Sequence, residues 1–212
     1  MFSEKPFWDG SFSKEEGGSM NGRLEVITGC MFSGKTEELI RRIKRVRIAH
    51  GHVLVFKPTI DDRYKQNAIV THYGRELDAH LFIPGHESFG TLKEVMGEKK
   101  LRGATVVAFD EGNFFSDKLP ALCEVLVAEG KRVIVAGLDL TFAGKPFGPM
   151  PALMALADDV AKLHAVCVKC GEDATRTQRL IDGKPAPLND EVVKVGGLKD
   201  YEARCLDCWE IG

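Results

Sequence analysis

The segment that most constrains this chain is residues 29–36, which read G-C-M-F-S-G-K-T. They fit G-x-x-x-x-G-K-[ST], a pattern whose glycines let successive backbone N–H groups surround a phosphate. The apolar run at 24–27 predicts a strand before the pattern, and residues 37–49 predict a helix after it. This context favours a phosphate-binding loop (P-loop). The alternative is an ordinary glycine-rich turn between a strand and a helix.

The chemistry of such a loop assigns roles to its residues. Lys35 would neutralise charge on the β- and γ-phosphates of a nucleotide, and the Thr36 hydroxyl would bind Mg²⁺. We therefore expect the whole loop to bind ATP, through Gly29, Cys30, Met31, Phe32, Ser33, Gly34, Lys35 and Thr36.

An acidic pair follows a second apolar run. Residues 105–109 predict a buried strand that ends at Asp110 and Glu111. Downstream of a P-loop, an Asp in this place helps to hold Mg²⁺, and a second carboxylate can accept a proton from an attacking hydroxyl. The alternative is a solvated acidic pair at a strand end. The P-loop upstream favours the first interpretation.

The remaining pattern predicts an α/β fold. Further apolar runs suit buried parallel strands, at 53–56 and 132–136. Two segments predict helices, at 88–99 and 116–129. We expect Ser116 to cap the second helix and Gly130 to end it. Two short β-like runs indicate an excursion from the main sheet, at 68–72 and 80–83. The alternation of elements favours a mostly parallel sheet with helices on both faces.

Four of the six cysteines form two C-x-x-C pairs. In a chain without a signal-peptide pattern, such pairs indicate a metal site rather than disulfides. Four thiolates suit tetrahedral Zn²⁺ in a closed structural site. The predicted ligands are Cys167, Cys170, Cys205 and Cys208. The alternative is a redox C-x-x-C, which would need only one pair at the start of a helix.

Length and charge exclude several functional classes. The 212 residues can form one α/β domain with a small appendage, and 44% of them are hydrophobic, enough for a core. The 29 basic and 31 acidic residues give a formal net charge of −2, which does not support nucleic-acid binding. No apolar run is long enough to span a bilayer, so we expect a cytoplasmic protein with no membrane partner. Residues 1–20 are expected to form a flexible tail.

In combination, these motifs resemble those of thymidine kinases of the type shared by bacteria, DNA viruses and the animal cytosol. The resemblance runs from about Arg23 to Trp209. It rests on the four cysteines and on G-C-M-F-S-G-K-T at 29–36, D-D-R-Y at 61–64, D-E-G-N-F-F at 110–115, G-L-D-L-T-F at 137–142, K-P-F-G at 145–148 and G-G-L-K-D-Y-E-A-R-C at 196–205.

The resemblance implies a fold and an assembly. It implies a RecA-like P-loop domain with a mostly parallel sheet and a small C-terminal zinc-binding lasso domain, whose long loop closes over the nucleoside. The implied boundaries are residues 21–164 for the ATP-binding kinase domain and 165–212 for the zinc and lasso domain. Members of this family form tetramers and are inhibited by their triphosphate end product. We therefore expect a homotetramer with thymidine triphosphate as its feedback inhibitor.

The resemblance also implies a reaction and its residues. The γ-phosphate of ATP would pass to the 5′-hydroxyl of thymidine or deoxyuridine, giving dTMP from thymidine in nucleotide salvage. Glu111 matches the general base, and Asp61 and Arg63 match residues close to the phosphates and the metal. The residues that match those around the base and sugar are Met31, Phe114, Leu138, Phe142, Thr177, Val195, Gly196 and Tyr201. Asn113 and Leu140 depart from the family pattern beside this pocket, so they bear on the breadth of substrates.

Two alternative functions remain open from the sequence. One is a P-loop ATPase whose zinc module binds nucleic acid or a partner, although the balanced charge weighs against it. The other is a different nucleoside kinase, such as one that prefers deoxyuridine.

Overall fold

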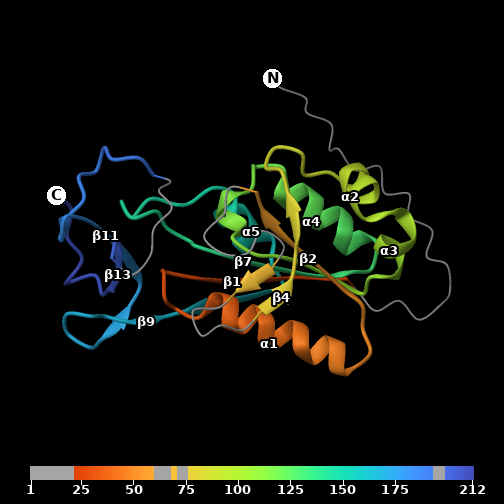
Figure 1. Cartoon of the computed structure of the whole chain (residues 1–212), viewed down its shortest axis with the longest axis horizontal. Helices are drawn as coiled ribbons and strands as arrows, with labels where there is room; N and C mark the ends of the chain where they lie inside the picture. The colour runs from red at the N-terminus through yellow and green to blue at the C-terminus, as the bar shows by residue number, and fades with distance from the viewer. Residues whose placement is uncertain (1–21, 60–67, 71–75, 193–198) are drawn as a thin grey trace, which may run out of the picture.

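A computed structural model describes residues 22–59, 68–70, 76–192 and 199–212. Several predictions lie outside these residues: the tail at 1–20, Asp61 and Arg63, and Val195 and Gly196. Figure 1 shows an α/β body and, at its left, a smaller module of strands that contains the C-terminus. None of the described helices is long and apolar enough to cross a membrane.

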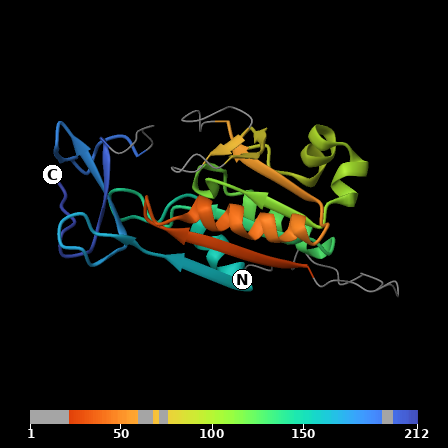
Figure 2. The ribbon, with the colours of Figure 1, turned by 60° about the horizontal axis from the view of Figure 1, so that its bottom comes forward.

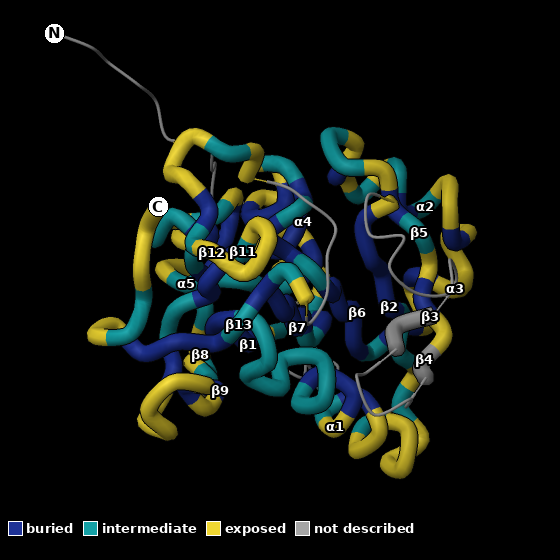
Figure 3. The backbone as a smooth tube through the Cα atoms, turned by 60° about the vertical axis from the view of Figure 1, so that its left-hand side comes forward, coloured by how far each residue is buried: buried dark blue, intermediate teal, exposed yellow. Residues whose placement is uncertain are grey.

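One sheet forms the centre of the body. Among the described residues it has the strand order β5-β2-β6-β7-β1-β8, and all its neighbouring pairs are parallel. Its strands are β1 (Arg23–Gly29), β2 (Val53–Pro58), β5 (His80–Phe82), β6 (Val106–Phe109), β7 (Arg132–Gly137) and β8 (Asp159–Leu163). Apolar runs form the strands β2, β6 and β7, where both faces of the sheet are covered, and Figure 3 shows β6 buried along its length. The edge strand β8 is mostly exposed. The predicted parallel α/β sheet is confirmed.

Helices cover the two faces of this sheet. On one face α1 (Lys35–Ile48) packs through Leu39, Ile40 and Ile43 (Figure 2). The opposite face packs against α2 (Phe89–Met96), α3 (Glu98–Gly103), α4 (Leu119–Ala128) and α5 (Met150–Leu156). Along β2, β6 and β7 the side chains alternate between these two layers, as the two-residue period of a strand requires.

The predicted excursion from the sheet is only half right. β3 (Ala68–Val70) pairs with β4 (Glu76–Asp78) in a separate antiparallel hairpin. In contrast, β5 is the edge strand of the main sheet, where His80 pairs with Phe56 of β2. The Phe82 ring then packs edge-on against the Phe56 ring, with 5.9 Å between ring centroids. The three residues of β5 are too few to specify a partner strand by themselves. Burial of the two aromatic rings therefore favours the parallel pairing of β5 with β2.

Two helix boundaries differ from the prediction. The helix expected at 88–99 is two helices, because Gly97 (φ 78°) ends α2 before α3 begins. Ser116 does not cap α4, which begins at Leu119. Instead, the Ser116 N–H and hydroxyl donate to the buried Glu87 carboxylate, at 2.8 and 2.6 Å. The predicted stop is confirmed, since Gly130 (φ 75°) follows the end of α4.

A buried carboxylate fixes α1 to the sheet. Glu25 of β1 accepts hydrogen bonds from Arg132 of β7 at 2.6 and 2.8 Å, and from Arg42 of α1 at 2.6 Å. Burial alone would raise the pKa of Glu25, but the arginines outweigh it and lower that pKa to about 2. Glu25 therefore stays ionised at neutral pH and holds the helix that begins at Lys35.

The C-terminal module is built from short antiparallel strands. β9 (Ala165–Val166) pairs with β10 (Asp173–Ala174), and β11 (Arg176–Ile181) lies between β12 (Lys184–Pro185) and β13 (Tyr201–Arg204). The sequence predicted none of these strands, because four of them have only two to four residues and the six-residue β11 (R-T-Q-R-L-I) is mostly polar.

Candidate active site

The P-loop joins β1 to α1, as its motif predicts. Gly29 (φ 141°) and Gly34 (φ 84°) have backbone conformations that favour glycine. A Cβ atom at Gly29 would lie 2.2 Å from the Leu163 carbonyl oxygen on β8, so no side chain fits there. The helix begins at Lys35, directly after Gly34. The N-terminus of α1 therefore faces the loop, as phosphate binding requires.

Lys35 folds back over this loop. Its Nζ donates to the Cys30 carbonyl oxygen at 2.8 Å. Burial lowers the pKa of Lys35, while the nearby Glu111 and Asp110 carboxylates act in the opposite direction. Lys35 lines the same cavity as both predicted acidic residues, within the loop that would hold the phosphates.

The acidic pair, Asp110 and Glu111, follows β6 in a turn with a strained backbone. Asp110 is buried, and its N–H donates to the Phe56 carbonyl oxygen on β2 at 2.9 Å. Glu111 adopts a left-handed backbone (φ 51°, ψ 44°) immediately before the 3₁₀ helix η1 (Gly112–Phe114). A non-glycine residue in this conformation costs free energy and is frequent at functional sites. One cavity contains the pair and the P-loop, and it is lined by Met31, Phe32, Gly34, Lys35, Thr36, Glu37, Asp110, Glu111 and Leu138.

A second, more apolar cavity adjoins the first. Its lining residues are Met31, Phe114, Leu138, Leu140, Thr141, Phe142, Phe147, Thr177, Val192 and Tyr201. Met31 and Leu138 line both cavities, so the two spaces are neighbours. All the nucleoside residues expected from the resemblance that the structure describes line this cavity. The sequence reasoning missed Thr141, Phe147 and Val192, although Phe147 belongs to the K-P-F-G segment and could have been found there.

Asn113 and Leu140, the two residues that depart from the family pattern, occupy different positions relative to the apolar cavity. Asn113 is buried behind the apolar cavity, and its Oδ1 accepts from the Leu138 N–H at 2.9 Å. Leu140 lines the cavity and forms an isolated β-bridge with Pro146. Asn113 thus orients Leu138, which lines the cavity, by a hydrogen bond to the Leu138 backbone. Leu140 itself lines the cavity.

The P-loop is also fixed to the C-terminal module. The Cys30 Sγ donates to the Ala174 carbonyl oxygen at 3.3 Å, and the Met31 N–H donates to the Thr177 hydroxyl at 3.0 Å. Cys30 also packs in one apolar cluster with Cys167 and Cys205. Burial raises the pKa of the Cys30 thiol, which suits a structural role.

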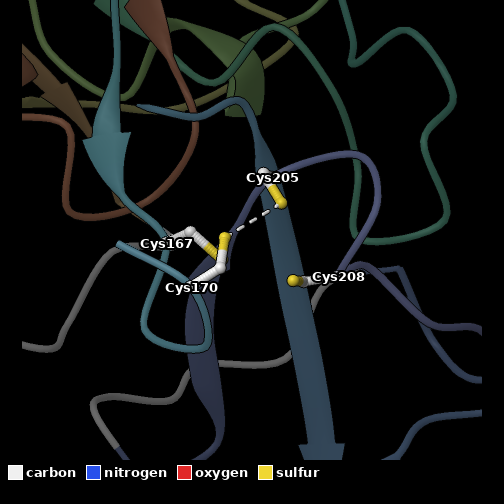
Figure 4. A group of neighbouring side chains, drawn as sticks. All are labelled: Cys167, Cys170, Cys205 and Cys208. Carbon is white, nitrogen blue, oxygen red and sulfur yellow. Dashed lines mark hydrogen bonds between the residues drawn. The ribbon is translucent and has the colours of Figure 1, made fainter. Parts of the chain in front are cut away.

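The two cysteine pairs come together in this module. Cys167 and Cys170 lie in the turn between β9 and β10, and Cys205 and Cys208 follow β13 (Figure 4). Their four sulfur atoms all lie within 4.8 Å of one another, and those of Cys170 and Cys205 are 3.6 Å apart. Tetrahedral zinc with Zn–S bonds of about 2.3 Å places sulfurs about 3.8 Å apart, so the cluster could hold this ion.

The protonation of these thiols also fits a metal site. Although burial opposes it, hydrogen bonds from the backbones of Cys205, Cys170 and Lys169 lower the pKa of Cys167 to about 6. The neighbouring Cys205 and Cys170 side chains, in contrast, raise the pKa of Cys208 to about 12. Four thiolates as close together as these sulfurs would repel one another, and a divalent metal removes that repulsion.

Purified protein is expected to contain one zinc ion per chain, measured by elemental analysis. Substitution of both Cys205 and Cys208 by serine should remove the zinc and lower the melting temperature. Cys123→Ala is the control, because Cys123 is buried in the main core and should leave the zinc content unchanged. Wild-type protein without zinc, or a double variant that keeps it, would contradict the assignment.

Comparison with known proteins gives one consistent family. The sequence model of the family described as thymidine kinase matches residues 22–209. The thymidine kinase of Coprothermobacter proteolyticus is 51% identical over 187 residues, which cover 88% of this chain and 90% of that protein. The thymidine kinase of Halobacterium salinarum is 47% identical, over 89% of this chain and 94% of that protein. That of Haloquadratum walsbyi is 43% identical, over 89% and 95%. The chain belongs to the thymidine kinase family.

Proposed function

We propose that this protein transfers the γ-phosphate of ATP to the 5′-hydroxyl of thymidine, giving dTMP. The observation that supports this most directly is the junction of the two cavities. The polar cavity contains the P-loop and the acidic pair, and it shares Met31 and Leu138 with the apolar cavity. A nucleoside with its base in the apolar cavity would thus direct its sugar towards the phosphates.

The residues of the polar cavity supply the chemistry of phosphoryl transfer. Lys35 and the loop N–H groups neutralise charge on the transferring phosphate, which is the main requirement of this reaction. Thr36 and Asp110 would hold Mg²⁺, which would neutralise further phosphate charge. Glu111 accepts the proton of the 5′-hydroxyl as general base. Family resemblance adds Asp61 and Arg63 near the phosphates and the metal.

The residues of the apolar cavity account for the choice of a pyrimidine. The Phe114 and Phe142 rings and the Met31 side chain offer apolar and stacking contacts to a flat base. Main-chain groups near Val195 and Gly196 are proposed to read the edge of the base through donors and acceptors. Cytosine has an amino donor where thymine has a carbonyl acceptor, so one buried group would lose its partner.

We expect thymidine to have the highest kcat/KM, with deoxyuridine within about tenfold because it lacks only one methyl group. Deoxycytidine should be about ten- to a hundredfold poorer or worse, since an unpaired buried polar group costs about 1–3 kcal/mol. Purine nucleosides should be inert. Competition assays measure these ratios, and efficient use of deoxycytidine or deoxyadenosine would contradict the proposed pocket.

A single assay separates this function from the ATPase alternative. Labelled ATP is mixed with a panel of nucleosides, with and without single-stranded DNA. The proposed kinase transfers label to thymidine and is insensitive to DNA. ATP hydrolysis that DNA stimulates, with no labelled nucleotide formed, would favour the alternative instead.

Family resemblance also supports further parts of the proposal. Residues 21–164 would form the ATP-binding domain and 165–212 the zinc and lasso domain. The end of β8 at Leu163 and the start of β9 at Ala165 support that boundary. The protein would act in the cytoplasm as a homotetramer that thymidine triphosphate inhibits. Light scattering would measure the assembly, and titration with the triphosphate would measure the inhibition.

A further inference from the structure

Arg179 is an unusual residue of the C-terminal module, because its long charged side chain is fully buried. It lies on β11, and only 1% of its surface is exposed. Its Nη1 donates to the Glu191 carbonyl oxygen, and its Nη2 lies 2.9 Å from the Asp190 carboxylate. The Asp190 contact is close but outside hydrogen-bond geometry, so Coulomb attraction links the pair. Among the described residues, the Arg179 Nε has no hydrogen-bond partner.

The same guanidinium lies over two walls of the apolar cavity. Its central carbon is 5.0 Å from the centroid of the Phe142 ring and 5.9 Å from that of Tyr201. Tyr201 is the direct cross-strand neighbour of Arg179 on β13. Both rings line the cavity, whereas Arg179 lies behind them. Arg179 therefore joins residues from three separate segments: Phe142, Tyr201, and Asp190 with Glu191.

The energetics argue for a specific role of this residue. Burial of a guanidinium carries a large desolvation cost, and an apolar side chain of similar volume often gives equal or greater stability. The cation–π contacts and the ion pair with Asp190 offset part of that cost, but within the part of the chain that the structure describes the Nε has no hydrogen-bond partner. An arginine at this place is thus poorly explained by stability alone, and its planar group fits two rings and a carboxylate at once.

The backbone of Phe142 is held independently of its ring. The Trp209 Nε1 donates to the Phe142 carbonyl oxygen at 3.2 Å. Removal of the Arg179 side chain would remove one contact of the Phe142 ring, whereas the Trp209 hydrogen bond to the backbone would remain. The expected consequence is a local change in the wall of the base cavity.

We propose that Arg179 is a positioning residue for the nucleoside. It holds the Phe142 and Tyr201 rings in the orientation that receives the base, and it anchors residues 190–191 behind them. This inference rests on the proposed function, since it assigns the base to the apolar cavity. Arg179 would not touch the substrate, so its loss should weaken nucleoside binding without a comparable effect on ATP.

The test compares three variants in steady-state assays, with calorimetric titration of thymidine and ATP. Arg179→Met keeps the volume but removes the charge and the planar group. It should raise both KM and Kd for thymidine by about tenfold or more, with the ATP values within about twofold. Arg179→Lys should give an intermediate increase. Arg176→Met is the matched control, because Arg176 lies on the same strand and its side chain bonds only to Thr175 among the described residues.

The possible outcomes distinguish a failure of this inference from a failure of the proposed function. If wild-type protein binds thymidine but fails to phosphorylate it, the proposed function is wrong, and the titrations still test Arg179. Wild-type protein that does not bind thymidine would overturn both. If Arg179→Met matches Arg176→Met, or weakens ATP and thymidine equally, the inference is wrong. Melting temperature and zinc content monitor the fold. Should Arg179→Met not fold, Asp190→Asn must raise the thymidine Kd by itself, and an unchanged Kd in that variant would overturn the inference.

Discussion

Glu111→Gln is expected to lower kcat for thymidine phosphorylation by about a hundredfold or more, while the KM for ATP stays close to that of the wild type. Glutamine keeps the size and the hydrogen-bonding reach of glutamate, but it cannot accept the 5′-hydroxyl proton at neutral pH. The effect should appear in kcat because proton transfer belongs to the transition state and not to ATP binding.

The environment of Glu111 makes this substitution a clean probe. The residue holds a left-handed backbone at the end of β6, and glutamine has no greater steric cost there than glutamate. Glu124→Gln is the control, since Glu124 lies exposed on α4. Both kcat values are measured with ATP and thymidine at saturation. If kcat of Glu111→Gln fell by less than about twofold, another residue would have to take the proton.

Lys35→Ala is expected to leave a folded protein that is nearly inactive, with kcat/KM reduced by about a thousandfold. The ammonium group is the cation of the P-loop, and its removal leaves the γ-phosphate charge without that partner in a buried site. The fold should survive because Leu39, Ile40 and Ile43 still pack α1 against the sheet.

Lys44→Ala is the matched control for this prediction, because Lys44 lies exposed on the same helix. It should keep wild-type kcat/KM, and both variants should keep the melting temperature within a few degrees. Normal turnover by Lys35→Ala would refute the assignment of the P-loop as the phosphate site.

The local features of this fold were predictable from sequence, whereas the pairings between distant segments were not. The P-loop and the strand before Asp110 follow from glycine conformation and from apolar runs, which depend only on neighbouring residues. The position of His80–Phe82 at the sheet edge depends on packing against Phe56, about 25 residues away in the chain. Likewise, Ser116 has the side chain of a helix cap but bonds Glu87, which no local pattern could show.

The same distinction between local and distant residues applies to the two cavities of the candidate site. The polar cavity is built mainly from two contiguous motifs, so the sequence could specify it. The residues that line the apolar cavity come from six separate stretches of the chain. Spacing alone gives no reason to group Phe114 with Tyr201. Family resemblance brought those residues together, but it assigned no place in the pocket to Val192 or to Phe147 of the matching K-P-F-G segment. Both enter the cavity through tertiary packing. The position of Arg179 behind the rings is visible only in three dimensions.

The strand order has a consequence for how this protein folds. Among the described strands, β1 pairs with β7 and β8 and not with β2. Arg23 pairs with Arg132, and Glu25 pairs with Asp159, across more than 100 residues of chain. Loop-closure entropy must therefore be overcome before β1 gains its neighbours, which slows folding. On a ribosome, the P-loop emerges early but cannot acquire its final geometry until β7 and β8 have been synthesised, so its phosphate affinity should appear late.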